Sequence, residues 1–572
     1  MKVLAVIPAR GGSKAIKRKN LRLLKGRPLI DYAIKLALLT PAISDVVVTT
    51  DDDRIAEYAG THYDVYIRRR PLRLAEDDVP LDPVVEDAVD FVEQFKSEMF
   101  DIVLTIQPTS PTLKVPTLAR ALNDFIEKQD ADSYVSVVDD THLRWGYQDG
   151  EIIPLYSERV NRQWLPKTYR ETGAFVISKR SVISQSDRLG PHPKVWPVPS
   201  EEAIDIDNAL DWLIAETILS RLDLLFVVLG NRFAGLGHVY RSLTLADTFL
   251  GHNVQFVALN SSPQTTELIA QSGYEHRTAE SLKEVCRIVS ALQPDIVIND
   301  ILDTEEWYVK SLRSMGTFVV NFEDLGEGSL QADLVFNALY ELSSPPPNHR
   351  FGAKYVCLRE DFLLYPPAPF RDPPSTLLVT FGGVDENNLT VKVCHILPEL
   401  INGGGLKRVL MVLGPAYLHE KELESCLNSL EEAIRSKVQI YKSVDNMAKL
   451  MREADVAITS NGRTVYELAA MGVPGVTISQ NDRETLHLFS RYSGGFRYLG
   501  LGNSLSEDAI VKAVLSIVKD ISERKKMREA LENVDLRGGL ERVKREILDA
   551  YWRWKDERNN HREAKISERE DQ

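Results

Sequence analysis

Short apolar runs alternate with amphipathic segments along the first 220 or so residues. The apolar and β-branched runs predict buried strands at 3–7, 45–50, 101–107, 133–138 and 173–178. Between them, 28–39 and 116–128 carry apolar residues at three- and four-residue spacing, which predicts helices. A further helix is expected over 207–222. Alternation of this kind is typical of an α/β domain with a mostly parallel sheet.

The same pattern restarts at "DLLFVVLGN" (223–231) and runs on through two similar α/β halves. The stretch "YPPAPFRDPPS" (365–375) is too rich in proline for regular structure and separates them. The sequence therefore predicts domains at 1–222, 223–370 and 371–550. Residues 551–572 are charged and mostly polar, so we expect them to fray as a solvated tail.

Composition narrows the class of protein. The 572 residues are 44% hydrophobic and 27% charged, as in soluble proteins with several domains. A net charge of −14 argues against general affinity for nucleic acid. The four cysteines form no CxxC pair, so neither a zinc site nor a disulfide framework is indicated. Without an apolar run of about 18 residues or a signal-peptide core, we expect no membrane span and a cytoplasmic protein.

The first predicted strand runs into "PARGGSK", two glycines ringed by cations. Glycines let backbone N–H groups gather around a phosphate, and the cations supply charge. The loop matches neither GxxxxGK[ST] nor GxGxxG. The alternative is a surface turn that happens to be basic.

Further motifs follow in a specific order: "VVVTTDDDRIAEYA", "RRRP", "LTIQPTSP", "NRQWLPKTYRETGAFVISKR" and "AIDIDNALDWLIAE". Together with the glycine loop they resemble the CMP-sialic acid synthetase family (acylneuraminate cytidylyltransferases) over residues 1–220. The resemblance implies a Rossmann-like nucleotidyltransferase that joins CTP to a nonulosonic acid, giving a CMP-sugar and pyrophosphate. Such a step depends on positioning and charge neutralisation.

The resemblance also implies roles for individual residues. Those expected to bind CTP are Arg10, Gly11, Gly12, Ser13, Lys14, Lys19, Asn20 and Arg70. Those expected to face the sugar are Gln107, Arg162 and Gln163, with a solvated surface arginine as the alternative for Arg162. Thr172 stands where many relatives have asparagine, and Pro80 roughly where a serine is often found. These departures leave the identity of the nonulosonic acid open.

Two carboxylates stand two residues apart in "AIDID". In an extended segment Asp205 and Asp207 point the same way and repel unless a cation lies between them. Mg²⁺ favours oxygen ligands and bridges phosphates, and the resembling family uses this pair for that metal. Alternatively, Asp207 caps the helix that follows. Arg10, Lys19 and Asp207 are the expected catalytic residues of this domain.

A second glycine loop, "GLGHVYR", follows the strand at 223–228. With "PDIVIND", "LLVTFGGVDENNLTVKV" and "ADVAITSNGRTVYELAAMGVPGVTIS", it resembles the glycosyltransferase-B superfamily, and in particular the UDP-sugar hydrolase of pseudaminic acid synthesis. The resemblance implies a UDP-sugar site between two Rossmann-like halves. The residues expected there are Gly237, Arg241, Gly382, Gly383, Ser460, Asn461, Gly462, Thr464 and Glu467. Arg463 replaces a usually small residue near the phosphates.

By the same resemblance, His238 is the base that deprotonates water attacking the anomeric carbon. The alternative is a histidine that only packs or caps a helix. The favoured hypothesis is a bifunctional enzyme of nonulosonic acid synthesis that needs Mg²⁺ and forms a homo-oligomer, a dimer through the first domain. Three alternatives stay open: a glycosyltransferase in the C-terminal part, a non-catalytic nucleotide-sugar-binding module there, or activation of 3-deoxy-octulosonate by the first domain.

Overall fold

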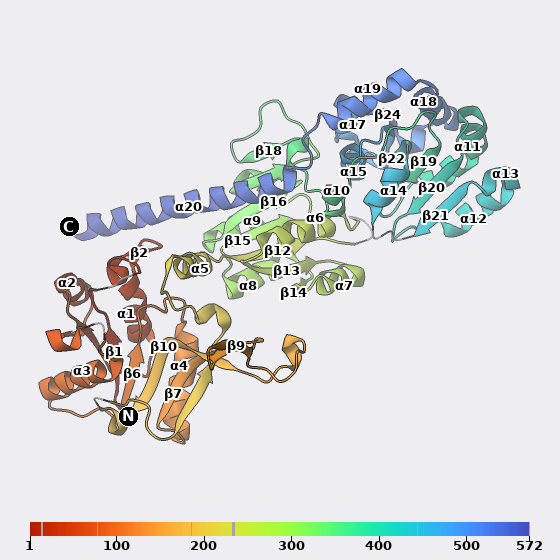
Figure 1. The fold of residues 1–572 in the computed structure, drawn as a ribbon. Helices are drawn as coiled ribbons and strands as arrows, with labels where there is room; N and C mark the ends of the chain where they lie inside the picture. Colours follow the sequence, from red (N-terminus) through yellow and green to blue (C-terminus); the bar gives the residue numbers. More distant parts are fainter. Residues whose placement is uncertain are drawn as a thin grey trace. The chain divides into compact units, whose positions relative to one another are not determined.

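The chain forms two compact units, residues 1–221 and 222–572 (Figure 1). The structure, a computed structural model, describes residues 1–12, 15–76, 78–184, 186–231, 235–442, 444 and 446–570. Side chains of the C-terminal helix are described as far as Arg558. The units divide one residue before the end of the domain expected at 1–222.

A seven-stranded sheet in the order β11-β7-β10-β6-β1-β4-β5 forms the centre of the first unit. Its neighbours are parallel except β10, which runs antiparallel to β6 and β7. Its strands are β1 Val3–Pro8, β4 Asp45–Thr50, β5 Tyr66–Arg69, β6 Ile102–Ile106, β7 Ser133–Asp139, β10 Tyr169–Lys179 and β11 Pro193–Pro197. The strands expected from apolar runs are therefore present, and the mostly parallel sheet is confirmed.

Helices cover both faces of this sheet, because successive side chains of a strand point to opposite faces. Val3, Ala5 and Ile7 of β1 pack with α1, α2 and α4, whereas Leu4 and Val6 pack with α3. The helices are α1 Leu29–Leu39, α2 Asp53–His62, α3 Leu81–Lys96, α4 Val115–Lys128 and α5 Ala209–Leu219. The carboxyl ends of the parallel strands thus stay open at one edge.

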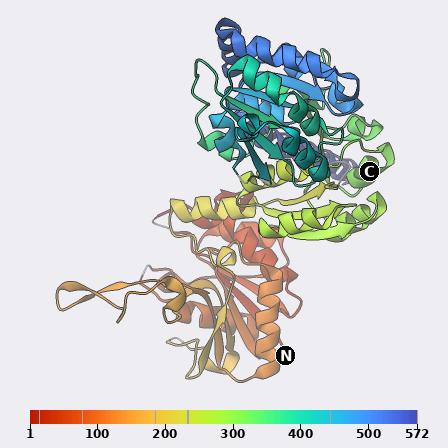
Figure 2. The same ribbon diagram turned by 90° about the vertical axis from the view of Figure 1, so that its right-hand side faces the viewer.

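Two short hairpins complete the unit: β2 Leu23–Leu24 with β3 Arg27–Pro28, and β8 Trp145–Gln148 with β9 Glu151–Pro154. The β8–β9 hairpin extends away from the sheet of its own unit (Figure 2). Large apolar side chains on it and after it are exposed, among them Trp145, Tyr147 and Trp164.

The second unit begins with a seven-stranded parallel sheet in the order β14-β13-β12-β15-β16-β17-β18. Its strands are β12 Asp223–Val228, β13 Asn253–Leu259, β14 Glu275–Ala279, β15 Ile296–Asp300, β16 Phe318–Phe322, β17 Leu334–Asn337 and β18 His349–Phe351. Residues from α6 and α7 pack on one face and from α8 and α9 on the other. The helices of this half are α6 Gly237–Ala246, α7 Pro263–Gln271, α8 Leu282–Leu292, α9 Glu306–Ser314 and α10 Asp361–Leu364.

A six-stranded parallel sheet in the order β21-β20-β19-β22-β23-β24 follows after the proline-rich segment. Its strands are β19 Thr376–Thr380, β20 Arg408–Leu413, β21 Val438–Lys442, β22 Val456–Ser460, β23 Gly475–Ser479 and β24 Phe496–Leu501. Its helices are α11 Leu389–Gly404, α12 Glu420–Ser429, α13 Glu432–Arg435, α14 Met447–Glu453, α15 Thr464–Ala470, α16 Asp482–Thr485, α17 Phe489–Tyr492, α18 Glu507–Lys519 and α19 Ile521–Glu532. Two consecutive Rossmann-like sheets are the architecture of the glycosyltransferase-B fold, as expected.

The end of the chain corrects one expectation. Residues 551–558 are not a frayed tail but part of a long helix, α20 Gly539–Glu570, which returns to the first half of the unit (Figure 1). Tyr551 is 1% exposed, its hydroxyl donates to Asp295 at 2.5 Å, and its ring packs edge-on against Phe318. The aromatic residues Tyr551, Trp552 and Trp554 within the charged stretch pack on the hydrophobic core, and they are the sequence feature that indicates an ordered helix here.

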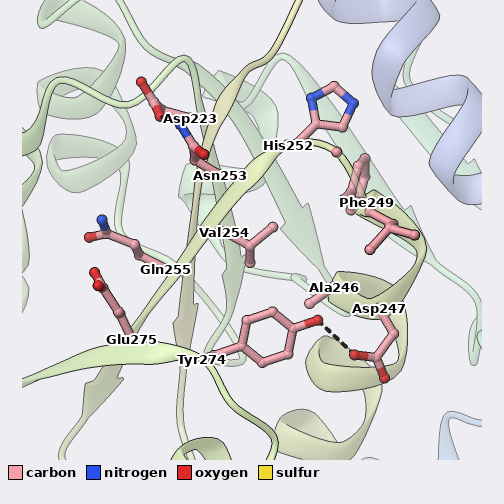
Figure 3. A pocket seen from close by; sticks show the side chains of 12 residues that line it. Asp223, Ala246, Asp247, Phe249, His252, Asn253, Val254, Gln255, Tyr274 and Glu275 are labelled. Carbon is pink, nitrogen blue, oxygen red and sulfur yellow. Dashed lines mark hydrogen bonds between the residues drawn. The ribbon is translucent and has the colours of Figure 1, made fainter. Parts of the chain in front are cut away.

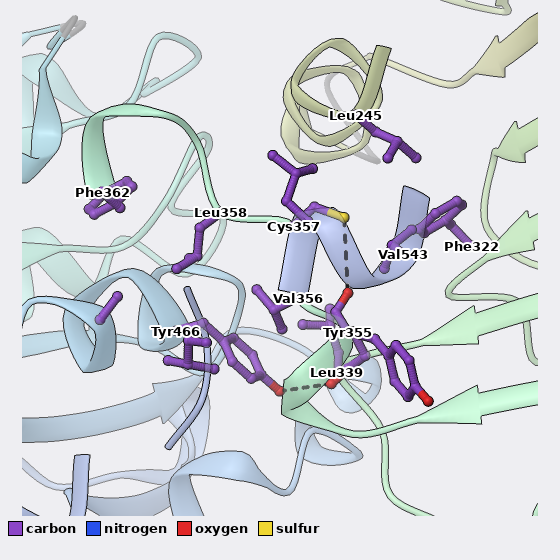
Figure 4. Close-up of a cluster of buried hydrophobic side chains, with 14 of the residues drawn as sticks. Leu245, Phe322, Leu339, Tyr355, Val356, Cys357, Leu358, Phe362, Tyr466 and Val543 are labelled. Atoms are coloured by element: carbon purple, nitrogen blue, oxygen red, sulfur yellow. Dashed lines mark hydrogen bonds between the residues drawn. The ribbon is translucent and has the colours of Figure 1, made fainter. Parts of the chain in front are cut away.

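One hydrophobic cluster runs through both halves of the second unit (Figure 4). It joins Phe322 and Leu339 of the first half to Tyr466 of α15, whose hydroxyl donates to the Ala338 carbonyl at 3.4 Å. The two halves are thereby packed into one body. Over the part of the chain that the structure describes, none of the helices combines the length and apolarity that crossing a membrane requires.

Candidate functional sites

The glycine loop after β1 lies against the start of α2. The amide of Gly11 donates to Asp51 Oδ1 at 2.9 Å, and a Cβ at Gly11 would stand 2.7 Å from the Cβ of Asp52. Asp52 caps α2 by accepting from the amides of Arg54 and Ile55. A glycine is therefore required at position 11 by close approach, whereas a Cβ at Gly12 would meet nothing within 4 Å.

Two further expected residues, Asn20 and Arg70, lie close to this loop. Asn20 donates from Nδ2 to the Arg10 carbonyl at 2.9 Å, so its side chain holds the backbone of the loop. Arg70 is 8% exposed, and its Nη2 donates to the Thr49 carbonyl at 3.0 Å. Burial lowers the pKa of Arg70, and the nearby charge of Arg10 lowers it further. Ser13 and Lys14 lie outside the described residues.

Lys19 connects the loop region to the aspartate pair. Its Nζ donates to the Ile206 carbonyl at 2.6 Å and lies 3.6 Å from Oδ1 of Asp207. The Asp207 side chain is 75% exposed. It does not cap α5, because Asn208 does so in a capping box with Asp211. The capping alternative for Asp207 is therefore wrong.

Asp205 lies beneath Asp207, beside Gln107. Its Oδ1 is buried and has no hydrogen-bond partner in the described part of the chain. Burial raises the pKa of the Asp205 carboxyl and the charge of Asp207 adds to the rise, while the nearby Thr109 hydroxyl and the charge of Lys19 oppose it. A Cβ at Gly173, where φ is +70°, would stand 3.2 Å from Gln107 Nε2 and 3.3 Å from Asp205 Oδ2. Gly173 thus leaves room for both side chains at one edge of the sheet.

The other two residues expected to face the sugar do not join this group. Arg162 and Gln163 lie on an exposed 3₁₀ turn (Arg162–Trp164), and no side-chain bond ties them to Gln107 or Asp205 in the described chain. Thr172 is fully buried and donates to Ser136 Oγ at 2.8 Å. Its departure from the family pattern therefore changes the support under Gly173 and not a surface that a sugar could touch.

A buried charge network surrounds His238 in the second unit. Nδ1 of His238 lies 2.6 Å from Oδ1 of Asp300, the last residue of β15. Because a carboxylate only accepts, Nδ1 carries the proton and Nε2 keeps its lone pair. Burial alone would raise the pKa of Asp300, but the charge of Arg241, with the hydrogen bonds from Arg241 and His238, outweighs it and holds this pKa well below its usual range. The carboxylate of Asp300 therefore fixes the orientation of the His238 ring.

Arg241 corrects a second expectation. Its guanidinium is 3% exposed and donates to Asp300 at 2.7 and 2.5 Å and to Glu323 at 2.9 Å. It has no free surface for a UDP-sugar and acts by positioning Asp300. Burial raises the pKa of Glu323, with Arg241 opposing the rise. Asp300 ends β15 and Glu323 directly follows β16, both buried strands. A carboxylate at the end of a buried parallel strand could have indicated these two site residues from the sequence, but it was not used.

The loops after β19 and β22 meet at the carboxyl edge of the second sheet. Gly382 has φ +77°, and a Cβ at Gly414 would stand 2.2 Å from the Gly382 carbonyl and 2.4 Å from that of Gly383. Ser460 Oγ lies 3.8 Å from the Cβ position of Gly382. Gly414 is therefore required by its contact with this loop and Gly382 by its left-handed φ, whereas a Cβ at Gly383 would meet nothing within 4 Å.

Asn461 corrects a third expectation. Its Nδ2 donates to the carbonyls of Glu484 and His487, and its Oδ1 accepts from Ser490, so the side chain is used up inside the protein. Gly462 leaves room for Glu484, whose Oε1 stands 3.1 Å from the Cβ position. Burial raises the pKa of Glu484 to about 7.

The start of α15 reaches toward the first half of the unit. Thr464 is the first residue of α15, and Glu467 lies one turn later, where Arg359 pairs with it at 3.4 Å. Arg463 precedes the helix and donates from Nη2 to the Cys357 carbonyl at 3.0 Å. A Cβ at Gly237 would stand 3.4 Å from Cδ of Arg463. Residues expected on separate halves, Gly237 and Gly462–Thr464, are therefore brought together.

A cavity of about 520 Å³ lies elsewhere (Figure 3). It is lined at the amino ends of β12, β13 and β14 by Asp223, Asn253 and Glu275, with Tyr274 donating to Asp247 at 2.6 Å. The charge network and the glycine loops instead lie at the carboxyl ends, where parallel α/β sheets bind ligands. We therefore assign the site to the carboxyl ends and not to this cavity.

The fold and these two sites define a protein with a Rossmann-like nucleotidyltransferase unit followed by a glycosyltransferase-B-like unit. Residues 4–149 match the cytidylyltransferase family, and residues 376–536 match the glycosyltransferase family 28 C-terminal domain.

Three relatives show similarity at the level of sequence. The pseudaminic acid cytidylyltransferase of Campylobacter jejuni is 29% identical over 224 residues, which cover 38% of this chain and 96% of that enzyme. The CMP-N,N'-diacetyllegionaminic acid synthase of Legionella pneumophila is 31% identical over 229 residues, covering 38% and 97%. An uncharacterized protein of Methanocaldococcus jannaschii is 30% identical over 271 residues, covering 44% of this chain and 54% of its own length. Through its first unit, the chain belongs to the cytidylyltransferase family.

The chain spans only about half the length of the M. jannaschii relative. Among solved structures, MurG of Acinetobacter baumannii is 15% identical, with a TM-score of 0.43, covering 57% of this chain and 99% of that one. A score this low supports no further argument.

Proposed function

We propose that the first unit transfers the cytidylyl group of CTP to a nonulosonic acid. The convergence of Gln107, Asp205 and Gly173 at one sheet edge, beside Lys19 and Asp207, is the observation that carries this proposal. This chain covers 96% and 97% of the length of two relatives, a pseudaminic acid cytidylyltransferase and a CMP-N,N'-diacetyllegionaminic acid synthase. In the reaction, the anomeric hydroxyl oxygen bonds to the α-phosphorus while the bond from that phosphorus to pyrophosphate breaks.

Asp205 and Asp207 fit a divalent cation. The unpartnered, buried Oδ1 of Asp205 has a raised pKa, and a cation would satisfy that oxygen and offset the repulsion from Asp207. No cluster of three or more His, Cys, Asp or Glu side chains suited to a metal occurs within the described residues. We infer that the remaining ligands of Mg²⁺ would come from the triphosphate. When bound, Mg²⁺ would neutralise charge that develops on the phosphates.

The residues of the chain itself position the substrates. Arg10 precedes and Lys19 follows, along the sequence, the loop that we propose for the triphosphate. Lys19 is held by the Ile206 carbonyl, so its charge is fixed beside Asp207. Gln107 offers an amide to sugar hydroxyls next to Asp205. Positioning of this kind is the main requirement of phosphoryl-type transfer.

Pyrophosphate release tests the first proposal. The full chain is incubated with CTP, Mg²⁺ and a panel of nonulosonic acids, including the pseudaminic, legionaminic and N-acetylneuraminic forms and 3-deoxy-octulosonate. We expect release with at least one nine-carbon acid and a CMP-sugar by mass spectrometry. Release with 3-deoxy-octulosonate alone would overturn the choice of acceptor, and release with none would overturn the function.

We further propose that the second unit hydrolyses a UDP-sugar, with His238 as the base. The His238–Asp300 pair supports this role, because it leaves Nε2 free to accept a proton from water. The water oxygen bonds to the anomeric carbon, the carbon–oxygen bond to UDP breaks, and UDP leaves with its charge. The matched glycosyltransferase family 28 domain favours a transferase as the second candidate, in which a hydroxyl acceptor replaces water.

Mass spectrometry of a UDP-sugar incubation separates these candidates. Free sugar with UDP supports hydrolysis, whereas an adduct formed only when an acceptor is added supports transfer. Neither product, together with retained UDP binding, would leave a non-catalytic nucleotide-sugar-binding module as the function.

We also propose that the protein is a dimer through its first unit. The exposed apolar side chains of the β8–β9 hairpin support this, as does the exposed position of Arg162 and Gln163. Light scattering on a size-exclusion column tests it, with Trp145→Ser and Tyr147→Ser expected to favour the monomer.

A further inference from the structure

Arg463, in the second unit, forms no ion pair with a described residue, unlike the arginines near it. Arg463 lies between the halves of the unit: it begins next to Gly462, its stem passes Gly237, and its guanidinium donates to the Cys357 carbonyl at 3.0 Å. Its charge is close enough to Arg241, Asp300 and Glu323 to shift its own pKa or theirs. Arg463 therefore stands where the loop of His238 meets the loop after β22.

The other arginines along this boundary are neutralised. Arg241 is paired with Asp300 and Glu323. Arg483 is paired with Asp303 at 2.8 and 3.0 Å, and Arg359 with Glu467 at 3.4 Å. Arg463 has one neutral acceptor, and no carboxylate forms an ion pair with it among the residues that the structure describes.

An unpaired cation in a partly buried position is costly. Its desolvation is offset only when an anion approaches, and a hydrogen bond to an anion is stronger than one to a carbonyl. Burial lowers the pKa of Arg463 and repulsion from Arg241 adds to that effect, while Asp300 and Glu467 oppose it without forming an ion pair with Arg463. A guanidinium held by one neutral carbonyl can gain a stronger, charge-assisted hydrogen bond when an anion approaches.

We propose that Arg463 reaches across the boundary between the halves to bind the diphosphate of the nucleotide, on the side of the phosphate linked to the sugar. This inference rests on the proposed nucleotide-sugar function of the second unit. It adds Arg463, which belongs to the loop after β22 in one half and acts beside His238, the proposed base, in the other. When the anomeric bond breaks, the leaving phosphate gains charge, and a fixed guanidinium stabilises that charge.

Nucleotide affinity tests this role in the full chain. UDP binding is measured by calorimetry and uridine binding by NMR titration, with CTP present throughout to occupy the first unit. For Arg463→Gln we expect UDP affinity to fall roughly 10- to 100-fold while uridine affinity stays unchanged, because only the phosphates contact the guanidinium. Arg463→Lys should recover part of the loss, since it keeps the charge but not the fork.

Arg483→Gln is the matched control. Arg483 also links the halves, through Asp303, the Glu323 carbonyl and Tyr340, but each of its three guanidinium nitrogens already donates within the protein. We expect it to leave the ratio of UDP to uridine affinity unchanged.

The outcomes separate this inference from the proposed function. If the wild-type chain binds UDP and Arg463→Gln keeps the same ratio of UDP to uridine affinity, Arg463 only joins the halves and the inference is wrong. If the wild-type chain binds no UDP, the nucleotide-sugar function fails, and this inference fails with it.

Discussion

The two proposed sites differ in how far the protein itself pairs their charged side chains. In the first unit, Asp207 is exposed, Lys19 is mostly buried beside it, and Asp205 keeps an unpartnered oxygen, so a ligand can still pair with these charges. In the second unit, His238, Asp300, Arg241 and Glu323 are already paired and largely buried. On the functions proposed above, metal and triphosphate would complete the first site, whereas the fold already holds His238, the proposed base of the second.

Removing the buried carboxylate of the first site should have the largest effect. For Asp205→Ala we expect CMP-sugar formation to fall about a thousandfold or more, because the transition-state charge loses its cation. Release of UDP from a UDP-sugar should not change. Pyrophosphate release and UDP release are measured on the same preparation, and a loss of both activities would contradict the independence of the two sites.

His238→Ala is the reciprocal test. Loss of a general base should reduce UDP-sugar turnover roughly 10²- to 10⁴-fold and leave cytidylyl transfer intact. Asp300→Asn should approach the same loss, since Nδ1 would no longer be oriented by a carboxylate. Unchanged turnover in His238→Ala would show that the histidine only packs.

The buried network should also decide the stability of the second unit. Arg241→Gln leaves Asp300 and Glu323 without their shared cation, so we expect the free energy of unfolding of this unit to fall by about 3–5 kcal/mol. Calorimetry measures its transition. Lys19→Gln, which removes a pair whose Asp207 side chain is 75% exposed, should lower stability by only about 1 kcal/mol. Equal losses would contradict the contrast between the sites.

A single methyl group should disturb the first site. Gly173→Ala forces a left-handed φ on alanine and presses on Gln107 and Asp205. We expect CMP-sugar formation to fall about 10- to 100-fold, since small misplacements at a reacting centre are costly. The control is Gly60→Ala in α2, where the new Cβ would stand 3.6 Å from Ile67 and activity should persist.

The last prediction concerns the dependence of stability on pH. Burial raises the pKa of Glu484 from 4.5 to about 7, so the folded state holds a proton that the unfolded state releases between these values. Its contribution to stability is complete below pH 4.5 and is lost as pH rises through 7. Glu484→Gln should therefore gain up to roughly 2–3 kcal/mol over wild type at pH 8 and nothing at pH 4. Asp482→Asn, an exposed neighbour, should show no such dependence.

The sequence alone determined the order of the elements and the loops that carry chemistry. Apolar runs and helical spacing are local patterns, so the strands at 3–7 and 45–50 and the helix after Asp207 could be predicted. The glycine loops, the Asp205–Asp207 pair and His238 could also be chosen, because their neighbours in sequence carry the pattern.

Only the tertiary structure decided which side chains meet. Asp300 lies 62 residues from His238 and Arg463 lies beside Gly237 from the other half, so no local pattern joins them. Arg241 and Asn461, which we expected to bind ligand, instead form hydrogen bonds inside the protein. Tyr551 anchors a helix where we expected a solvated tail. Burial and pairing depend on contacts between distant segments, and these are set when the sheets and helices pack.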